Sequence, residues 1–133
     1  MLTVSREDVK RKLRLTTSAY DAEIDALIAE MVPVLRYAIE PSYLHTSDPD
    51  LQATLNLGAL EVVAGEMGAT LYRELSAWAG FRIGWLQVLP PAPRDPSDPT
   101  GLKAQGYARL KPFLKRDAQL LFVYRPPEED EPR

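Results

Sequence analysis

Few side chains in this sequence have the types and spacing that catalysis or metal binding requires. The single histidine, His45, lies in a polar stretch with Asp48 and Asp50, and one histidine beside two acids is a weak pattern for a metal site. The chain has no cysteine, and no nucleophile–histidine pair of the kind found in catalytic triads can be assembled. We therefore expect His45 to be a solvated loop residue, and we expect no metal site.

Acidic side chains give no better case for catalysis. Glu61, Glu66 and Glu74 fall in one predicted helix, where rotation of about 100° per residue points them in different directions. Gly65 and Gly68 lie inside the same helix and do not follow a strand, so they do not form a phosphate-binding loop. We expect no catalytic residue, no cofactor and no enzymatic activity.

A basic cluster near the N-terminus suggests nucleic-acid binding. Its members are Lys10, Arg11, Lys12 and Arg14. A short helix, a turn and a longer helix here loosely resemble a helix-turn-helix motif, but the second helix begins with the acids Asp21, Glu23 and Asp25. Acids at that position repel phosphates. We therefore keep a small helical DNA-binding or regulatory protein, which would use this basic first helix, only as the alternative interpretation.

Hydrophobic periodicity predicts that the elements positioning these residues are helices over residues 6–14, 19–39, 48–79 and 101–110. Ser5 and Ser18 are the predicted N-caps of the first two helices, Asp48-Pro49 starts the third, and Thr100 caps the fourth. Pro33 should kink the second helix, and Gly80 should end the third. In a chain of 133 residues this pattern predicts one all-α bundle of about four helices with a long central helix.

The third predicted helix is apolar over two neighbouring sectors, so we expect it to touch more than one neighbour. Its glycines, Gly58, Gly65 and Gly68, gather on one side of the helix within an arc of about 80°. Glycine is unfavourable inside a helix, so this grouping indicates close approach of another backbone. That backbone belongs either to the same chain or to a neighbouring subunit.

Residues 81–100 form an apolar and proline-rich arm. Its apolar members are Phe81, Ile83, Trp85, Leu86, Val88 and Leu89, and five prolines follow between residues 90 and 99. The prolines exclude a continuous helix or a central strand, and the apolar side chains need a surface to pack on. That surface is the chain's own core or another subunit, so these residues and the three glycines are candidates for a subunit interface.

Five apolar residues follow the last predicted helix: Leu120, Leu121, Phe122, Val123 and Tyr124. Their β-propensity fits a segment that docks on a partner by adding a strand, and the alternative is that they fold back over their own bundle. The acidic tail that follows is expected to be disordered. We thus divide the chain into a helical domain over residues 1–119 and a C-terminal docking segment with its tail over residues 120–133.

Net charge is −3, but the charges are unevenly distributed. Residues 48–80 carry five acids and one basic residue, and residues 81–119 carry seven basic residues and three acids. Such segments suit electrostatic complementarity between copies or partners. No apolar run approaches the roughly 18 residues of a membrane span, and no signal peptide is recognisable, so we expect an intracellular origin and no membrane partner.

Three helical stretches and one turn of this sequence follow a pattern that is found in a known protein family. Residues 2–15 read LTVSREDVKRKLRL, Asp21 leads into IDALIAEMVPVLRYAI, and residues 51–74 read LQATLNLGALEVVAGEMGATLYRE. These segments resemble the head–tail connector proteins, the adaptor family of long-tailed phages, and Leu110-Lys111-Pro112-Phe113 is similar to the leucine–proline–aromatic turn that closes the family's fold. Two features depart from the family: Pro33 interrupts a helix that is usually smooth, and a C-terminal stretch follows the point where many members end.

The resemblance implies a small helical bundle that assembles as a homo-oligomeric ring of about twelve subunits in the virion. The ring lies between the portal protein and a tail or stopper protein, and it extends the channel through which double-stranded DNA passes non-specifically. Such a protein is made in the host cytoplasm and brings no catalytic residues. Because basic side chains would retain DNA, we expect an acidic or mixed-charge channel lining, with Asp50, Glu61 and Glu66 as candidates.

Overall fold

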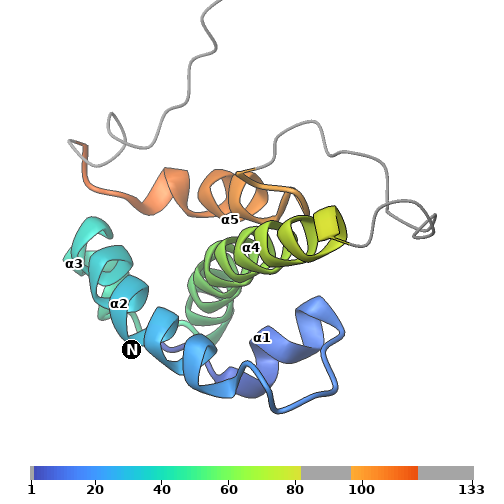
Figure 1. The fold of residues 1–133 in the computed structure, drawn as a ribbon. Coiled ribbons are helices and arrows are strands. Elements are labelled where there is room, and N and C mark those ends of the chain that lie inside the picture. The colour runs from blue at the N-terminus through green and yellow to red at the C-terminus, as the bar shows by residue number, and fades with distance from the viewer. Residues whose placement is uncertain (1, 82–96, 117–133) are drawn as a thin grey trace, which may run out of the picture.

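The computed structural model describes residues 2–81 and 97–116, with the side chains of residues 75–81 left out (Figure 1). Its helices are α1 (Arg6–Leu13), α2 (Asp21–Ala38), α3 (Pro41–Leu44), α4 (Pro49–Phe81) and α5 (Leu102–Leu110), followed by a 3₁₀ turn, η1 (Lys111–Phe113). The chain is a small all-α bundle, as the periodicity predicted, and the one-turn helix α3 is the element that the sequence interpretation missed. Most of the predicted arm and the whole C-terminal docking segment lie outside the described residues.

The long helix α4 is the centre of the bundle. In Figure 1 it passes through the middle of the molecule, with α5 on one side and α1 and α2 on the other, and it packs against all three. Every residue from Gly58 to Gly65 is buried, so two turns of this helix have no solvent-facing side. The prediction of more than one neighbour is confirmed. At 1.5 Å per residue, its 33 residues span about 50 Å.

Several helix starts follow from local capping. The Ser5 hydroxyl accepts a hydrogen bond from the Asp8 amide at 3.2 Å, and the Asp48 carboxylate accepts one from the Asp50 amide at 3.0 Å, as expected of N-caps. Proline starts α4 at residue 49, as predicted. The assignment of Ser18 as a cap is wrong, because α2 begins at Asp21 after Tyr20 and has no side-chain cap.

The start of α5 uses more than the predicted cap. Thr100 Oγ1 does accept a hydrogen bond from the Leu102 amide at 3.2 Å. The Asp98 carboxylate also accepts hydrogen bonds from the amides of Lys103 and Ala104, at 3.0 and 2.9 Å. These bonds satisfy amides that have no partner in the first turn of the helix, and they fix the loop before α5 to its N-terminus.

Two helix ends differ from the prediction. Helix α4 continues through Gly80 to Phe81, because a glycine inside a helix costs only about 1 kcal/mol and does not by itself end it. Helix α2 runs through Pro33 and ends at Ala38. Ile39 is extended and forms an isolated antiparallel bridge with Leu114, beside a 2.8 Å bond from the Lys115 amide to the Ala38 carbonyl.

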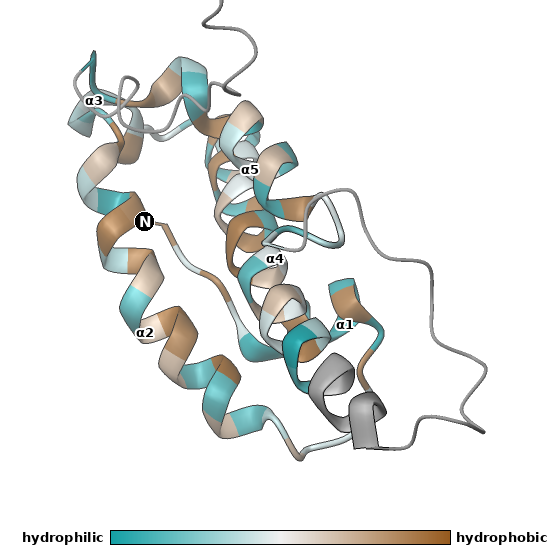
Figure 2. Cartoon of the chain, turned by 45° about the horizontal axis from the view of Figure 1, so that its top comes forward, coloured by the Kyte–Doolittle hydropathy of each residue, from teal (hydrophilic) through white to brown (hydrophobic). Residues whose placement is uncertain are grey.

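The segment before α1 lies between α2 and α4 (Figure 2). Leu2 is buried in the core, and its carbonyl accepts a hydrogen bond from Arg36 Nη2 on α2 at 3.3 Å. On the other side, the Thr3 amide donates to Asn56 Oδ1 on α4 at 3.0 Å. The segment therefore closes part of the space between these helices. In the described part of the chain, no helix combines the length and apolar character needed to cross a membrane.

Candidate interaction surfaces

The contact between α4 and α5 is a close backbone approach within one chain. A Cβ atom added to Gly106 would lie 2.7 Å from the Gly58 carbonyl oxygen and 2.8 Å from the Val62 amide nitrogen. One added to Gly65 would lie 2.5 Å from the Lys103 amide nitrogen. Gly58 and Gly65 are therefore not subunit-interface residues, because α5 of the same chain already occupies the space that their missing side chains leave.

Gly68 also faces its own chain, but less tightly. A Cβ atom there would meet Thr100 Cγ2 at 3.1 Å and Leu13 Cδ2 at 3.6 Å, which are both side-chain atoms. The interpretation of Gly68 as an interface residue is thus wrong for the same reason. Of the alternatives that the sequence left open for the glycines, the structure selects packing within the chain.

A buried carboxylate crosses the α4–α5 contact. Glu61 is only 1% exposed, and its two oxygens accept hydrogen bonds from Arg109 Nε at 2.8 Å, Arg109 Nη2 at 3.1 Å and Gln105 Nε2 at 2.8 Å. Bidentate pairing with a guanidinium compensates for the loss of water around the carboxylate. The hydrogen bond to Glu61 raises the pKa of Arg109. Glu61 therefore does not line a channel, as the sequence interpretation expected, since its carboxylate is enclosed in the bundle.

The other two channel candidates lie in different surroundings. Glu66 Oε1 accepts a hydrogen bond from Lys103 Nζ at 2.9 Å, with both side chains partly buried. Asp50 is exposed in the first turn of α4. The three candidates are thus spread along one helix and do not form a common acidic face in the monomer. A channel position for Asp50 or Glu66 stays a prediction.

These pairs also change the interpretation of the segmental charge. The acids Glu61 and Glu66 belong to the acidic segment, and their partners Arg109 and Lys103 belong to the basic one. α4 and α5 run antiparallel, so Glu66, the later of the two acids, pairs with Lys103, the earlier of the two basic residues. At these positions the complementarity operates within the chain, where the sequence interpretation expected it between copies or partners.

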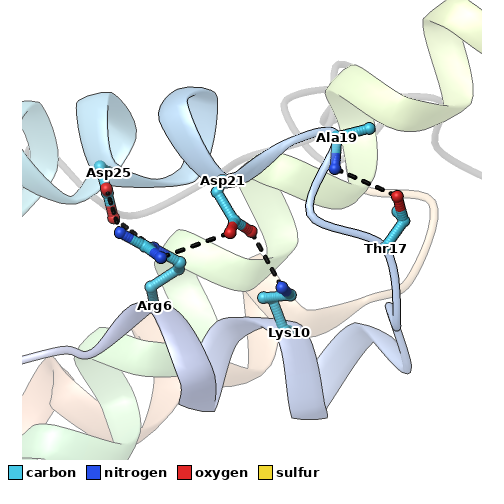
Figure 3. Close-up of polar contacts among 6 residues, drawn as sticks. All are labelled: Arg6, Lys10, Thr17, Ala19, Asp21 and Asp25. Atoms are coloured by element: carbon cyan, nitrogen blue, oxygen red, sulfur yellow. Dashed lines mark hydrogen bonds and ion pairs between the residues drawn. The ribbon is translucent and has the colours of Figure 1, made fainter.

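Ion pairs also join α1 to α2 (Figure 3). Arg6 donates to the Asp25 carboxylate at 3.0 and 2.7 Å and to Asp21 at 3.3 Å, and Lys10 Nζ donates to the other Asp21 oxygen at 2.9 Å. The hydrogen bond from Arg6 lowers the pKa of Asp25, and the same contact raises the pKa of Arg6. The acids at the start of α2, which argued against a recognition helix, thus hold the two helices together.

Two of the four residues of the basic cluster, Lys10 and Arg11, have carboxylate partners in the structure. The Lys10 side chain is 16% exposed and paired with Asp21, and Arg11 pairs with Asp8 one turn earlier at 2.6 Å. Lys12 and Arg14 are exposed. A phosphate backbone approaching this face would therefore meet a cluster already partly neutralised by carboxylates, which weakens the case for DNA binding.

His45 is exposed at the end of α3, where its amide donates to the Pro41 carbonyl at 3.0 Å. Within residues 2–81 and 97–116, no group of three histidine, cysteine or acidic side chains lies close enough to hold a metal ion.

An open apolar groove separates α2 from α5. It has a volume of about 280 Å³ and is lined by Glu30, Met31, Val34, Leu35 and Tyr107. Val34 is 60% exposed, and Tyr37, one turn further along α2, is 77% exposed. Lys115 Nζ lies 3.9 Å from the centre of the Tyr37 ring. The sequence interpretation did not predict this surface.

A signal for this groove is present in the sequence. Met31, Val34 and Tyr37 recur every three residues, so they form an apolar ridge along one side of α2. The sequence interpretation assigned Met31 to the wide apolar face of the second helix, together with Ile24 and Leu35, and gave Val34 and Tyr37 no role. A helix with apolar residues beyond its core-facing stripe is a candidate for a second contact.

Comparisons of this chain with models of protein families, with curated proteins and with solved structures find no match. The resemblance to the head–tail connector family therefore stays a prediction that depends on the residues quoted above.

Proposed function

We propose that this chain is a structural virion protein that forms a ring between the portal and the tail of a long-tailed phage. The observation that carries the proposal is a small helical bundle built around one long central helix, which is the architecture that the resemblance implies. In the ring, the chain would extend the DNA channel and offer a docking surface to the tail or stopper protein. Because folds host many functions, this support is an analogy that needs a direct test.

The use of polar side chains in the described residues also supports a structural role. Glu61 joins α4 to α5 through Arg109 and Gln105, and Asp21 joins α2 to α1 through Arg6 and Lys10. These groups satisfy one another across helix contacts and do not converge on a cavity where a substrate would bind. Such clusters are typical of a scaffold.

The direct test is assembly with the portal protein from the same source. We expect negative-stain electron microscopy of the mixture to show rings of this chain seated on the portal, and mass photometry to show a discrete oligomer near twelve copies. The portal alone and this chain alone are the controls. A chain that stays monomeric and does not bind the portal over the micromolar range would overturn the proposal.

The apolar arm provides a sharper version of this test. Trp85 lies at the centre of the segment that the sequence assigns to a subunit contact. We expect Trp85→Ala to weaken ring assembly while leaving the helical circular-dichroism spectrum unchanged, since large aromatic side chains dominate interface energies. If the variant unfolds as a monomer, the arm belongs to the chain's own core. Tyr37→Ala, which removes an exposed aromatic side chain from α2, is the matched control for ring assembly.

The DNA-binding alternative makes the opposite prediction. If Lys12 and Arg14 bind phosphates, a gel shift on short duplexes should appear at low salt and weaken steeply as salt rises. We expect no such shift, because Lys10 and Arg11 already have carboxylate partners. A salt-dependent shift that Lys12→Gln and Arg14→Gln abolish would favour the alternative.

A further inference from the structure

The groove between α2 and α5 has the properties of a site that binds an extended apolar segment. Its walls are Met31 and Val34 on one side and Tyr107 on the other, and buried Leu35 lies at its base. The volume of about 280 Å³ exceeds that of a single side chain, and the groove is open to solvent. An apolar surface of this kind, next to a ridge with Val34 60% exposed, is unfavourable without an occupant.

We propose that the occupant is the C-terminal run of the same chain, Leu120–Tyr124. The first reason is where the described chain ends. The Ile39–Leu114 bridge is antiparallel, so the backbone beyond residue 114 returns along the last residues of α2. The Lys115 amide bonds to the Ala38 carbonyl at 2.8 Å, and the Lys115 ammonium lies over the Tyr37 ring. The chain is thus directed onto the apolar ridge just before the run begins.

Length and chemistry agree with this assignment. Leu120 follows Arg116 by four residues, a span of up to roughly 14 Å when extended, whereas Tyr37 and Val34 are about 4.5 Å apart along the helix axis. The connection is therefore long enough for the run to reach the groove. Arg125 directly follows the run, and Glu30 is the charged residue among the groove's lining side chains, so the charges are complementary as well.

This inference goes beyond the ring proposal and does not depend on it. The sequence left two alternatives for the run, a partner protein or the chain's own bundle, and the position of Lys115 favours the bundle. A run held in the groove completes the hydrophobic core between α2 and α5. It is then inaccessible to any partner until it leaves that groove.

Disulfide trapping tests the inference cleanly, because the natural chain has no cysteine. The double variant Val34→Cys with Phe122→Cys places one thiol on the ridge and one at the centre of the run. Disulfide formation requires Cα atoms within about 7 Å, so cross-linking reports close approach. Under oxidised glutathione we expect a monomer that migrates faster on a non-reducing gel and returns to normal migration after reduction.

Two controls make the result specific. Ala29 is exposed on the same helix, about 140° around the axis from Val34, so Ala29→Cys with Phe122→Cys should lose the cross-link. Mixing the two single variants, Val34→Cys and Phe122→Cys, tests exchange between chains. If Val34→Cys disturbs folding by circular dichroism, Tyr37→Cys takes its place on the same ridge.

Each outcome decides the assignment. An intrachain cross-link in the groove variant and not in the Ala29 control supports it. A cross-linked dimer in the mixed single variants would assign the groove to a second copy. Equal cross-linking of the groove and control variants, or none in either, would show that the run does not occupy this groove.

Discussion

The two sides of α5 differ in how much of their contact is complete. On the α4 side, Gly106 and Gly58 let the backbones touch, and Glu61 is buried with its oxygens fully bonded. On the α2 side, Val34 and Tyr107 line an open groove, and the bridge between Ile39 and Leu114 joins the chain after α2 to the chain after η1. The α4–α5 contact therefore stabilises the fold, whereas the groove between α2 and α5 is open for a further segment to bind.

The largest effect should come from filling the closed side. In Gly106→Ala the new Cβ would meet backbone atoms of Gly58 and Val62 at 2.7 and 2.8 Å, and neither can move without shifting a helix. We expect a loss of about 3 kcal/mol in the free energy of unfolding, at the upper end of overpacking costs. Urea denaturation followed by circular dichroism measures it.

Gly68→Ala is the matched control for that substitution. It introduces the same methyl group into a helix, but the nearest atoms belong to the Thr100 and Leu13 side chains, at 3.1 and 3.6 Å. We expect it to be neutral or to stabilise by up to about 1 kcal/mol through helix propensity. Equal destabilisation by both substitutions would contradict the close-approach interpretation of the α4–α5 contact.

The second effect should come from the buried carboxylate. Glu61→Gln keeps the size of the side chain but replaces one carboxylate oxygen with an NH₂ group. That group is a donor and cannot accept the hydrogen bonds that Arg109 and Gln105 donate, so a buried hydrogen bond is lost. We expect a cost of about 2 kcal/mol. Glu66→Gln changes the same atoms in the more exposed pair with Lys103, where a cost below about 1 kcal/mol is expected. Similar losses in the two variants would show that burial of Glu61 is not what stabilises the contact.

The sequence predicted most of the helices and the close contact of α4 with another backbone. It did not predict which backbone that is, the burial of Glu61 or the groove. Periodicity and local caps found α1, α2, α4 and α5, because these signals act within a few residues of each helix. The glycines on one side of α4 predicted a close backbone. Whether that backbone was in the same chain depended on where α5 folds, which is a property of the tertiary structure.

The position of Glu61 was misjudged for a related reason. The helical wheel only showed that Glu61 points in a different direction from Glu66 and Glu74, and an acid is normally exposed, so a channel lining was the simpler interpretation. Burial became possible only because Arg109 and Gln105 lie opposite it, more than forty residues away in the chain. The groove beside Val34 was missed because ridge residues and core residues of α2 follow the same three- and four-residue spacing. The sequence alone does not distinguish a second apolar surface from a wide core-facing one.

The third effect concerns the open side and should be smaller. Val34→Ala removes two methyl groups from a ridge side chain that is 60% exposed in the described residues and that the docked run would cover only in part, so we expect a loss of about 1 kcal/mol in thermal or urea unfolding. Val32→Ala removes the same groups two residues earlier, where the side chain is 5% exposed, and should cost about 2 kcal/mol. A Val34 variant as unstable as the Val32 variant would show that the ridge is buried as fully as the core, and no loss at all would show that nothing covers it.

The smallest effect should come from the ion pairs that hold the other end of α2 to α1. The hydrogen bond from Arg6 lowers the pKa of Asp25 below its ordinary value of 3.8. Because the folded state binds that proton less tightly than the unfolded chain, the pair stabilises the fold above about pH 4 and loses this contribution as the pH falls through the lowered pKa.

Arg6→Gln should therefore reduce stability slightly at pH 7, and the difference from the natural chain should shrink below pH 4. Exposure to water limits the effect, since solvent-exposed pairs contribute little. Urea midpoints measured at pH 7, 4 and 3 check the sign. Lys12→Gln, which removes an exposed positive charge from the same helix, is the control. If the stability difference between the variant and the natural chain grows as the pH falls, Arg6 acts through something other than these carboxylates.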